Sequence, residues 1–385
     1  MDTRNSQKLR KTKWITNRAD QFIYTFATVV VLLVYGFEAT AGAQVTIHGN
    51  LPVNSGKYTL PATVSASASS PRGISGWQVY FGNTSYFSSS TGLNGILDEN
   101  LSNVPPGTYQ VTITAWDNGG NHSSYVVSNV TVISSPLPTP PQNATAYPNL
   151  QNKNEGYNNT TWQPCIGSCS GSNGPGSSSL SYPVSSPSLS GASLGENSDS
   201  SGDYYNTMYY WHLGCPNNNC SAVGNMLDDV WFQVKSGDSI QQLEFDPDLF
   251  DDSGRWEYFG SVACQMNGGT SGTWYVWDMA SQQKSGKGWT STSIPCTITQ
   301  GAWHHLQLYV TVNTSGSGCP NSAPCYTYKT LVFDGSTVFE NLNWSYNAGT
   351  GSYGHTVNVQ QQIDNFKASP ANNTVYYDNY ELWVW

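Results

Sequence analysis

Three carboxylates recur at alternate positions in one short stretch of the chain, Leu243-Glu244-Phe245-Asp246-Pro247-Asp248. Successive side chains of a β-strand point to opposite faces, so we expect Glu244, Asp246 and Asp248 on one face and Leu243 and Phe245 in a core. Carboxylates that share a face can act as nucleophile and general acid in the cleavage of a glycosidic bond. They can also accept hydrogen bonds from ligand hydroxyls, or simply face solvent.

Aromatic residues follow these carboxylates on two expected strands. Sugar rings stack on flat aromatic faces, so aromatic residues beside carboxylates favour a sugar-binding surface. The predicted ligand-binding residues are Glu244, Asp246, Trp256, Tyr258, Trp274 and Trp277. Alternation separates Trp274 from Tyr275 and Trp277, so at most one of these sets faces a groove.

Acidic residues crowd the turn after the carboxylate strand, where Asp248, Asp251 and Asp252 are weak candidates for a calcium site. An acidic turn without metal is the alternative, and no other cofactor is indicated. His304 and His305 are adjacent, so on a strand they point to opposite faces and cannot ligate one metal together. A structural role is favoured for both over a general base. No nucleophile-elbow, Walker or dinucleotide-binding motif occurs in a workable setting.

Charge and composition narrow the possible partners. Residues 1–43 hold six of the 15 basic and three of the 25 acidic residues, so the remainder carries nine against 22, a net charge near −13. Binding to nucleic acid needs clustered Lys and Arg, and neither occurs between Arg72 and Lys153. A polysaccharide or other glycan is the better candidate, because aromatics reach 13% and charged residues only 10%.

The first 43 residues have the order of an export signal. A basic stretch runs into the apolar residues 22–37, and Ala41, Gly42 and Ala43 precede Gln44. We expect cleavage after Ala43, with an uncleaved membrane anchor as the alternative. Either way, the rest of the chain is expected to be extracellular or on the cell surface.

Eight cysteines in an exported chain predict disulfides. Three pairs are close in sequence: Cys165 with Cys169, Cys215 with Cys220, and Cys319 with Cys325. Elimination leaves Cys264 and Cys296 for each other. Zinc is the competing interpretation, but these spacings do not match its usual ligand sets. Eight cysteines allow 105 connectivities in principle.

Strand patterns predict an all-β protein of two sandwiches. Short alternating runs fill residues 44–134, a Pro- and Asn-rich linker spans 135–156, and longer strands follow in 157–385 after a Ser/Gly-rich start. Residues 188–194 are a possible opening strand of the second unit. Residues 166–202 have no periodicity long enough for a helix, and the strands from residue 203 onward leave almost no helical signal.

The first unit resembles the bacterial immunoglobulin-like modules that precede catalytic or binding domains. The resemblance is carried by residues 75–80 and by residues 106–109 leading to Ala115, Trp116 and Asp117. It implies a β-sandwich that acts as a spacer. No cysteine lies in it, so only the architecture is carried over.

The second unit resembles the concanavalin A-like jelly rolls of legume lectins, laminin-G domains and β-glucanases. The resemblance rests on residues 242–246, 303–309 and 377–385 and covers about half of the chain. It implies a calcium-assisted lectin site, or the E-x-D-x-E strand of the glucanases, from which Asp248 departs by one methylene and Pro247 by its missing N–H. A groove-facing Arg or Tyr would instead favour a lyase.

The leading hypothesis is a secreted or surface-exposed carbohydrate-binding protein of the lectin or adhesin type. The alternative is a polysaccharide-degrading enzyme, a glycoside hydrolase or lyase, that uses Glu244 with Asp246 or Asp248. A purely structural surface protein is a third interpretation that the sequence leaves open.

Overall fold

The computed structural model describes residues 44–60, 62–91, 93–101, 103–133, 136–165, 176–201, 205–350, 355–366 and 371–385. In these ranges the chain is built from strands, short 3-10 turns and one α-helix, α2 (Met279–Ser285). The prediction of an all-β protein is confirmed. No helix in this part of the chain is long and apolar enough to cross a membrane. The expected export signal, residues 1–43, lies outside the described residues.

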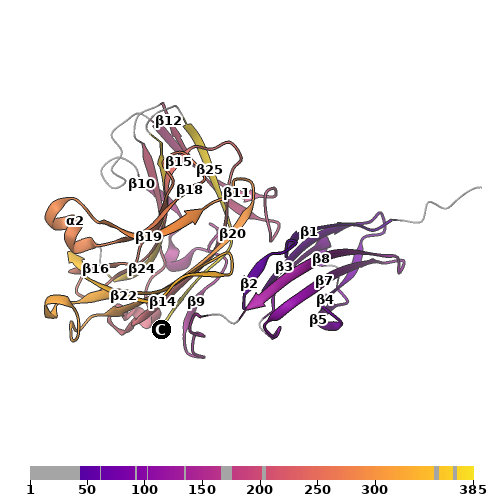
Figure 1. Ribbon diagram of the computed structural model, residues 1–385, viewed down its shortest axis with the longest axis horizontal. Coiled ribbons are helices and arrows are strands. Elements are labelled where there is room, and N and C mark those ends of the chain that lie inside the picture. Colours follow the sequence, from indigo (N-terminus) through magenta and orange to yellow (C-terminus); the bar gives the residue numbers. More distant parts are fainter. Residues whose placement is uncertain are drawn as a thin grey trace, which may run out of the picture.

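The N-terminal strands form two sheets that pack face to face (Figure 1). Their bounds are β1 (Thr46–Leu51), β2 (Lys57–Thr59), β3 (Ala62–Ser69), β4 (Ile74–Phe81), β5 (Thr84–Ser89), β6 (Ile96–Leu101), β7 (Gly107–Asp117) and β8 (His122–Ile133). One sheet has the order β1-β3-β6 and the other β2-β8-β7-β4-β5. Alternate residues of β4 and β7 are fully buried between them, as period-2 alternation predicts: Trp77, Val79, Val111, Ile113 and Ala115.

The C-terminal strands form a second, larger sandwich of a nine-stranded and an eight-stranded sheet. The first has the order β10 (Gln163–Cys165), β13 (Asn206–His212), β24 (Thr356–Asn365), β15 (Ile240–Phe250), β17 (Val262–Gln265), β18 (Ser271–Trp277) and β19 (Trp289–Thr297), with β16 (Trp256–Phe259) and β23 (Gly349–Thr350) off this path. The second has the order β11 (Gly176–Val184), β12 (Ser193–Ser200), β25 (Ala371–Val384), β14 (Asn225–Val234), β20 (Trp303–Asn313), β21 (Cys325–Phe333) and β22 (Ser336–Asn347), with β9 (Thr145–Tyr147) beside β25.

Two segments differ from the sequence expectation. β9 falls inside the expected linker, yet it pairs with Leu382 to Val384 of β25, and the Leu150 N–H donates to the Tyr380 carbonyl at 2.8 Å. Residues 188–192 form a loop before β12 rather than a strand. The buried Asp378 carboxylate holds this loop by accepting the Leu189 N–H at 2.7 Å and the Ser190 hydroxyl at 2.6 Å.

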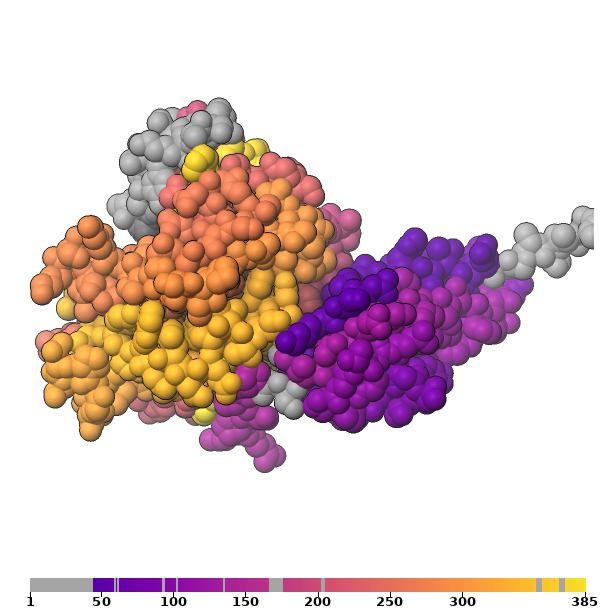
Figure 2. Space-filling view, viewed as in Figure 1, coloured from indigo at the N-terminus to yellow at the C-terminus, as the bar shows by residue number. Residues whose placement is uncertain are grey.

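The two sandwiches pack along a seam. Figure 2 shows the indigo β1 to β3 region lying directly against the gold part of the larger sandwich, where β2 contacts β22. The Ser65 hydroxyl donates to the Leu189 carbonyl at 2.8 Å, and the Asn379 amide donates to Asp98 at 3.0 Å. Trp231 of β14 is 4% exposed and joins the N-terminal core. Burial raises the pKa of Asp98 to about 6. The N-terminal sandwich therefore covers part of the eight-stranded sheet.

Three predicted disulfides are present. Cys215 pairs with Cys220 and Cys319 pairs with Cys325, while Cys264 of β17 and Cys296 of β19 join at a Cα–Cα distance of 6.0 Å. These six cysteines are bonded to one another, so the zinc interpretation is wrong for them. Cys169, the expected partner of Cys165, lies outside the described residues.

A polar network crosses the interior of the C-terminal sandwich. The Gln361 amide of β24 donates to the Tyr380 hydroxyl of β25 at 2.8 Å, linking the two sheets. Asp228 of β14 is fully buried among the apolar residues of this core. Burial raises the pKa of Asp228 to about 8, and the neighbouring Tyr380 hydroxyl opposes this shift only in part. Asp228 therefore carries a proton at neutral pH.

Removing the long-range disulfide should cost the most stability. The bond spans 32 residues, so its loss, as Cys264→Ser with Cys296→Ser, should lower the free energy of unfolding by about 3 to 4 kcal/mol. The matched control, Cys319→Ser with Cys325→Ser, opens a separation of only six residues and should cost less. Denaturant titration of both variants tests this. An equal or larger loss in the control would contradict the ranking.

Asp228 should make the fold sensitive to alkaline pH. Its pKa in the folded chain, about 8, lies above the ordinary value of 3.8, so the folded state holds a proton that the unfolded state releases. Stability is then highest below about pH 4 for this group and declines as pH rises toward 8 and beyond. In Asp228→Asn, the melting temperature should fall less between about pH 5 and about pH 9 than in the parent. Scanning calorimetry of both proteins in the same series of buffers measures this difference. Identical pH profiles would refute this.

Candidate functional site

Strand β15 divides its side chains between the core and a polar sheet face. Leu243, Phe245 and Leu249 are fully buried between the sheets. Glu244 and Asp246 alternate with them and lie on the opposite face, where Glu244 is 5% exposed and Asp246 0%. Asp248, also 0% exposed, continues the row. The structure thus brings the three predicted carboxylates onto one face.

The neighbouring strand β24 supplies amide partners for this row. Glu244 lies opposite Gln362, Asp246 opposite Gln360 and Asp248 opposite Asn358. Gln362 donates to Glu244 at 2.9 Å and also approaches Asp364 at 2.9 Å, and Gln360 donates to Asp248 at 3.0 Å. Asp246 accepts a hydrogen bond from the Ser261 hydroxyl. We call Glu244, Asp246 and Asp248 with their β24 amides the carboxyl–amide row.

Burial favours the protonated form of each carboxyl group in this row. It raises the pKa of Glu244 well above its ordinary value, and the nearby Asp364 and Asp246 carboxyls raise it further. Burial likewise raises the pKa of Asp246 and of Asp248. On β16, burial raises the pKa of Glu257 to about 7. The partners that oppose these shifts for Glu244 are neutral amides.

Two cavities lie over this sheet face, and Trp277 lines both. One, of about 360 Å³, has walls from β10, β13, β16 and α2, and the other, of about 520 Å³, is bounded by the turn between α2 and β19. Glu257 lines the first cavity and Glu244 the second. We call the two cavities together the groove. The Trp277 indole packs edge to face against Trp289, with ring centroids 4.9 Å apart.

The structure corrects the predicted set of aromatic ligands. Trp274 is 1% exposed and Tyr258 0%, both inside the core, and Trp256 packs against that core. These three therefore face away from the groove, because Glu257 and Trp277 alternate with them and take the groove side. Of the predicted aromatic residues, only Trp277 lines the groove.

Several groove residues were missed by the sequence reasoning. On β13, Tyr210 and His212 line the 360 Å³ cavity with ring centroids 5.1 Å apart. His212 Nδ1 lies 2.7 Å from the Asn358 amide oxygen. The signal was available in residues 356–365, where polar Asn358, Gln360 and Gln362 alternate with apolar residues, but an amide-rich strand has no chemical motif.

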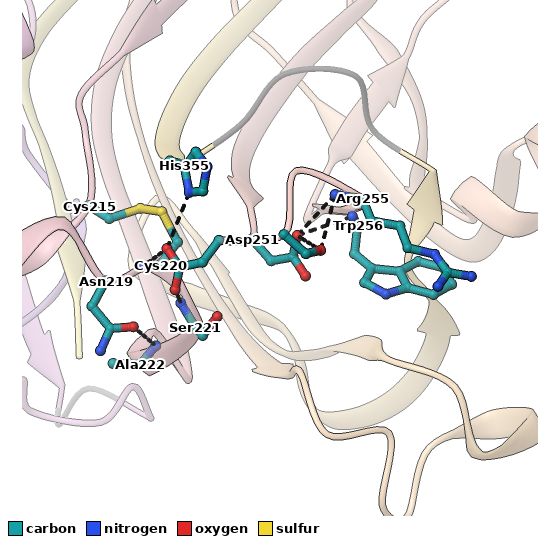
Figure 3. A network of polar contacts seen from close by, with 11 residues as sticks. Cys215, Asn219, Cys220, Ser221, Ala222, Asp251, Arg255, Trp256 and His355 are labelled. Carbon is teal, nitrogen blue, oxygen red and sulfur yellow. Dashed lines mark hydrogen bonds and ion pairs between the residues drawn. A yellow bond between two sulfur atoms is a disulfide. The ribbon is translucent and has the colours of Figure 1, made fainter.

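The candidate calcium residues have separate partners, and Figure 3 shows those of Asp251. Asp251 accepts the backbone N–H groups of Arg255 and Trp256, each at 3.2 Å. Asp252 accepts those of Cys220 at 2.9 Å and Ser221 at 2.8 Å; although burial alone would raise its pKa, these bonds lower it to about 2. Asp248 belongs to the carboxyl–amide row. Within the described ranges, no three acidic, His or Cys side chains are grouped to hold a metal ion.

His304 and His305 lie on opposite faces of β20, as predicted. His304 stacks on Phe333 and its Nδ1 lies 2.7 Å from Asp334. His305 stacks on Trp231 at 4.4 Å and its Nε2 lies 2.6 Å from Asp229. Both histidines are on the eight-stranded sheet, away from the groove.

No protein-family model and no curated protein matches the chain. Among solved structures, the chain is similar to carbohydrate-binding modules of the β-sandwich superfamily, with 13% identity, coverage of 88% of this chain and 96% of that one, and a TM-score of 0.29. It is similar to an alginate lyase from Aplysia kurodai, with 11% identity, 53% and 86% coverage and a TM-score of 0.33. It is also similar to the lectin UEA-II complexed with galactose, with 10% identity, 62% and 98% coverage and a TM-score of 0.27.

Proposed function

We propose that the protein binds a glycan in the groove of the nine-stranded sheet. The observation that carries the proposal is the carboxyl–amide row beside Trp277. Amide groups both donate and accept hydrogen bonds, as do protonated carboxyl groups, so the row matches sugar hydroxyls, which do the same. The half-exposed Trp277 ring offers a flat surface on which the C–H face of a sugar ring stacks.

Burial of the carboxyls favours binding over hydrolysis. A retaining glycosidase needs one ionised carboxylate that touches the anomeric carbon and one protonated acid nearby. Asp246 and Asp248 are 0% exposed and cannot reach a bound sugar in this conformation. Glu244 lines the groove, but its pKa is raised by burial and by neighbouring carboxyls, which disfavours the ionised nucleophile.

The roles proposed for the two sandwiches follow the family resemblances of their sequences. The larger sandwich is proposed as a concanavalin A-like recognition domain and the smaller as an immunoglobulin-like spacer on a secreted or surface-bound chain. The seam supports this arrangement, since the small sandwich packs on β14 and β25 of the eight-stranded sheet. The groove belongs to the other sheet and is left clear for a polymer.

Trp277→Ala should weaken glycan binding while preserving the fold. Loss of one stacking surface should raise the dissociation constant about tenfold. The matched control is Trp116→Ala, which removes a half-exposed tryptophan from β7 of the other sandwich. A glycan array identifies the ligand, and calorimetry compares the three proteins. Absence of binding to plant, algal, fungal and bacterial polysaccharides, or equal affinity in both variants, would refute the proposal.

A lyase is the second candidate, because a tyrosine faces the groove. Tyr210 lies beside His212, and a His and Tyr pair can remove and deliver the protons of a β-elimination. Tyr210→Phe should then abolish unsaturated products, measured as ultraviolet absorbance, whereas Glu244→Gln should retain them. No product from uronate polymers with the parent protein excludes this activity. It ranks second because polyuronates need cationic partners and Lys287 is the one Lys or Arg among the residues that line the two cavities.

A further inference from the structure

We propose that the groove selects glycans whose sugars carry protonated amino groups, such as polymers of glucosamine. The inference rests on the proposed glycan binding and names the chemical class of its ligand. It follows from the acidic residues that line the groove, from the lack of a cationic partner for them and from the position of Trp277.

The residues that line the groove are strongly unbalanced in charge. Glu244 and Asp364 line the 520 Å³ cavity, and Glu257 lines the 360 Å³ cavity. Asp246 and Asp248 lie in the same row beneath them. Lys287 is the one Lys or Arg among the residues that line the two cavities, and its side chain is exposed in the turn after α2. A polyanionic glycan would therefore meet repulsion along the whole groove.

The row has no cation of its own. The ion pairs identified in the described ranges each join a histidine to an aspartate, and none includes Glu244, Asp246, Asp248 or Glu257. Glu244 instead accepts hydrogen bonds from two neutral amides, Gln242 at 2.7 Å and Gln362 at 2.9 Å. An ammonium group that enters beside these carboxyl groups favours their ionised form and supplies the counterion that the protein lacks there.

Two buried oxygens of the row also lack a donor. Within the described part of the chain, Asp246 Oδ2 and Asp248 Oδ1 accept no hydrogen bond, although both residues are 0% exposed. Neither residue lines either cavity, so they act on a ligand only through the electrostatics of Glu244 and Glu257, their neighbours in the groove. An ammonium group offers three donors and no acceptor, whereas a hydroxyl offers one donor. The carboxyl groups that line the cavities thus fit an amino sugar better than a neutral one.

Trp277 places such a ligand across both carboxyl groups. Its side chain lines both cavities, so a sugar stacked on it has neighbours on the Glu244 side and on the Glu257 side. Amino groups repeated along a polymer can then meet each acidic group in turn. The Trp277 Nε1 atom is buried and has no acceptor among the described residues, so the ring acts on a ligand through its flat face.

Three hexasaccharides with one β-1,4 backbone test the selectivity. They differ only at carbon 2 of each ring, which carries a hydroxyl in cellohexaose, an acetamide in the chitin hexamer and an amine in the glucosamine hexamer. Calorimetry on the purified protein at about pH 6 should show the glucosamine hexamer binding at least about tenfold more tightly than cellohexaose. A hexamer of galacturonate should not bind.

The carboxyls should carry this difference. In Glu244→Gln with Glu257→Gln, the preference for the glucosamine hexamer over cellohexaose should fall from about tenfold to about onefold. The matched control is Glu340→Gln, an exposed carboxyl on β22. Lys287→Gln keeps the test decisive should the double variant misfold, because removing this exposed cation should raise affinity for the amine hexamer about two- to threefold.

Proton release gives an independent readout. Burial holds the pKa of Glu257 at about 7, so an ammonium bound beside it at about pH 6 should displace a proton into the buffer. The binding enthalpy should then vary with the ionisation enthalpy of the buffer for the amine hexamer alone. Equal affinity for all three hexamers, or no change in either carboxyl or lysine variant, overturns the charge selectivity and leaves glycan binding standing. Failure of every glycan on the array overturns both.

Discussion

The structure depends on burying a row of carboxyl groups in a sheet without giving them a cation. Strand β15 lies between β24 and β17, so each of its side chains must be compatible with both neighbours. A buried carboxylate beside other carboxylates is destabilised, and the group responds by holding its proton. A protonated carboxyl needs a partner that both donates and accepts. That requirement explains why β24 places amides, rather than lysine or arginine, opposite the row.

The same constraint appears inside the larger sandwich. Asp228 faces the core, and the link from Gln361 to Tyr380 crosses between the sheets beside it. Strand β24 therefore satisfies carboxyls on one face with Asn358, Gln360 and Gln362 and contributes Gln361 to the interior on the other. Apolar side chains at Val357, Val359 and Ile363 keep this strand anchored in the core. One strand thus couples the stability of the sandwich to the chemistry of its groove.

The alternation of side chains along a strand predicted correctly which residues share a face. It placed Glu244, Asp246 and Asp248 on one face, and it separated Trp274 from Trp277. It did not predict which face packs into the core, because that depends on the neighbouring strands and on pairing between residues distant in sequence. For this reason Trp256 and Tyr258 were assigned to the groove although they pack inward.

Long-range contacts account for the remaining differences. Residues 188–192 have the composition of a strand, but the Asp378 carboxylate, 188 positions further along the chain from Ser190, holds them as a loop. β9 was predicted to be part of the linker, because three residues are too few to show the alternation of a strand. Its pairing with β25 makes it a strand. Disulfides were the exception, since close spacing and elimination gave three pairs without knowledge of the fold.

The positions of buried polar groups without hydrogen-bond partners are informative about function. Orphaned acceptors and like charges destabilise a fold, and sequences retain such features mainly where a ligand relieves them. Here the unsatisfied oxygens of Asp246 and Asp248 lie on the sheet face that carries the two cavities, whereas those of Asp228 and Glu196 are buried elsewhere in the sandwich. The outer face of the eight-stranded sheet pairs its acids instead, as Asp229 does with His305 and with Gln307 at 2.7 Å. A ligand that donates hydrogen bonds to the groove would stabilise the folded chain in proportion to its occupancy, which makes the groove, rather than the seam or the outer sheet, the surface on which binding has the most to gain.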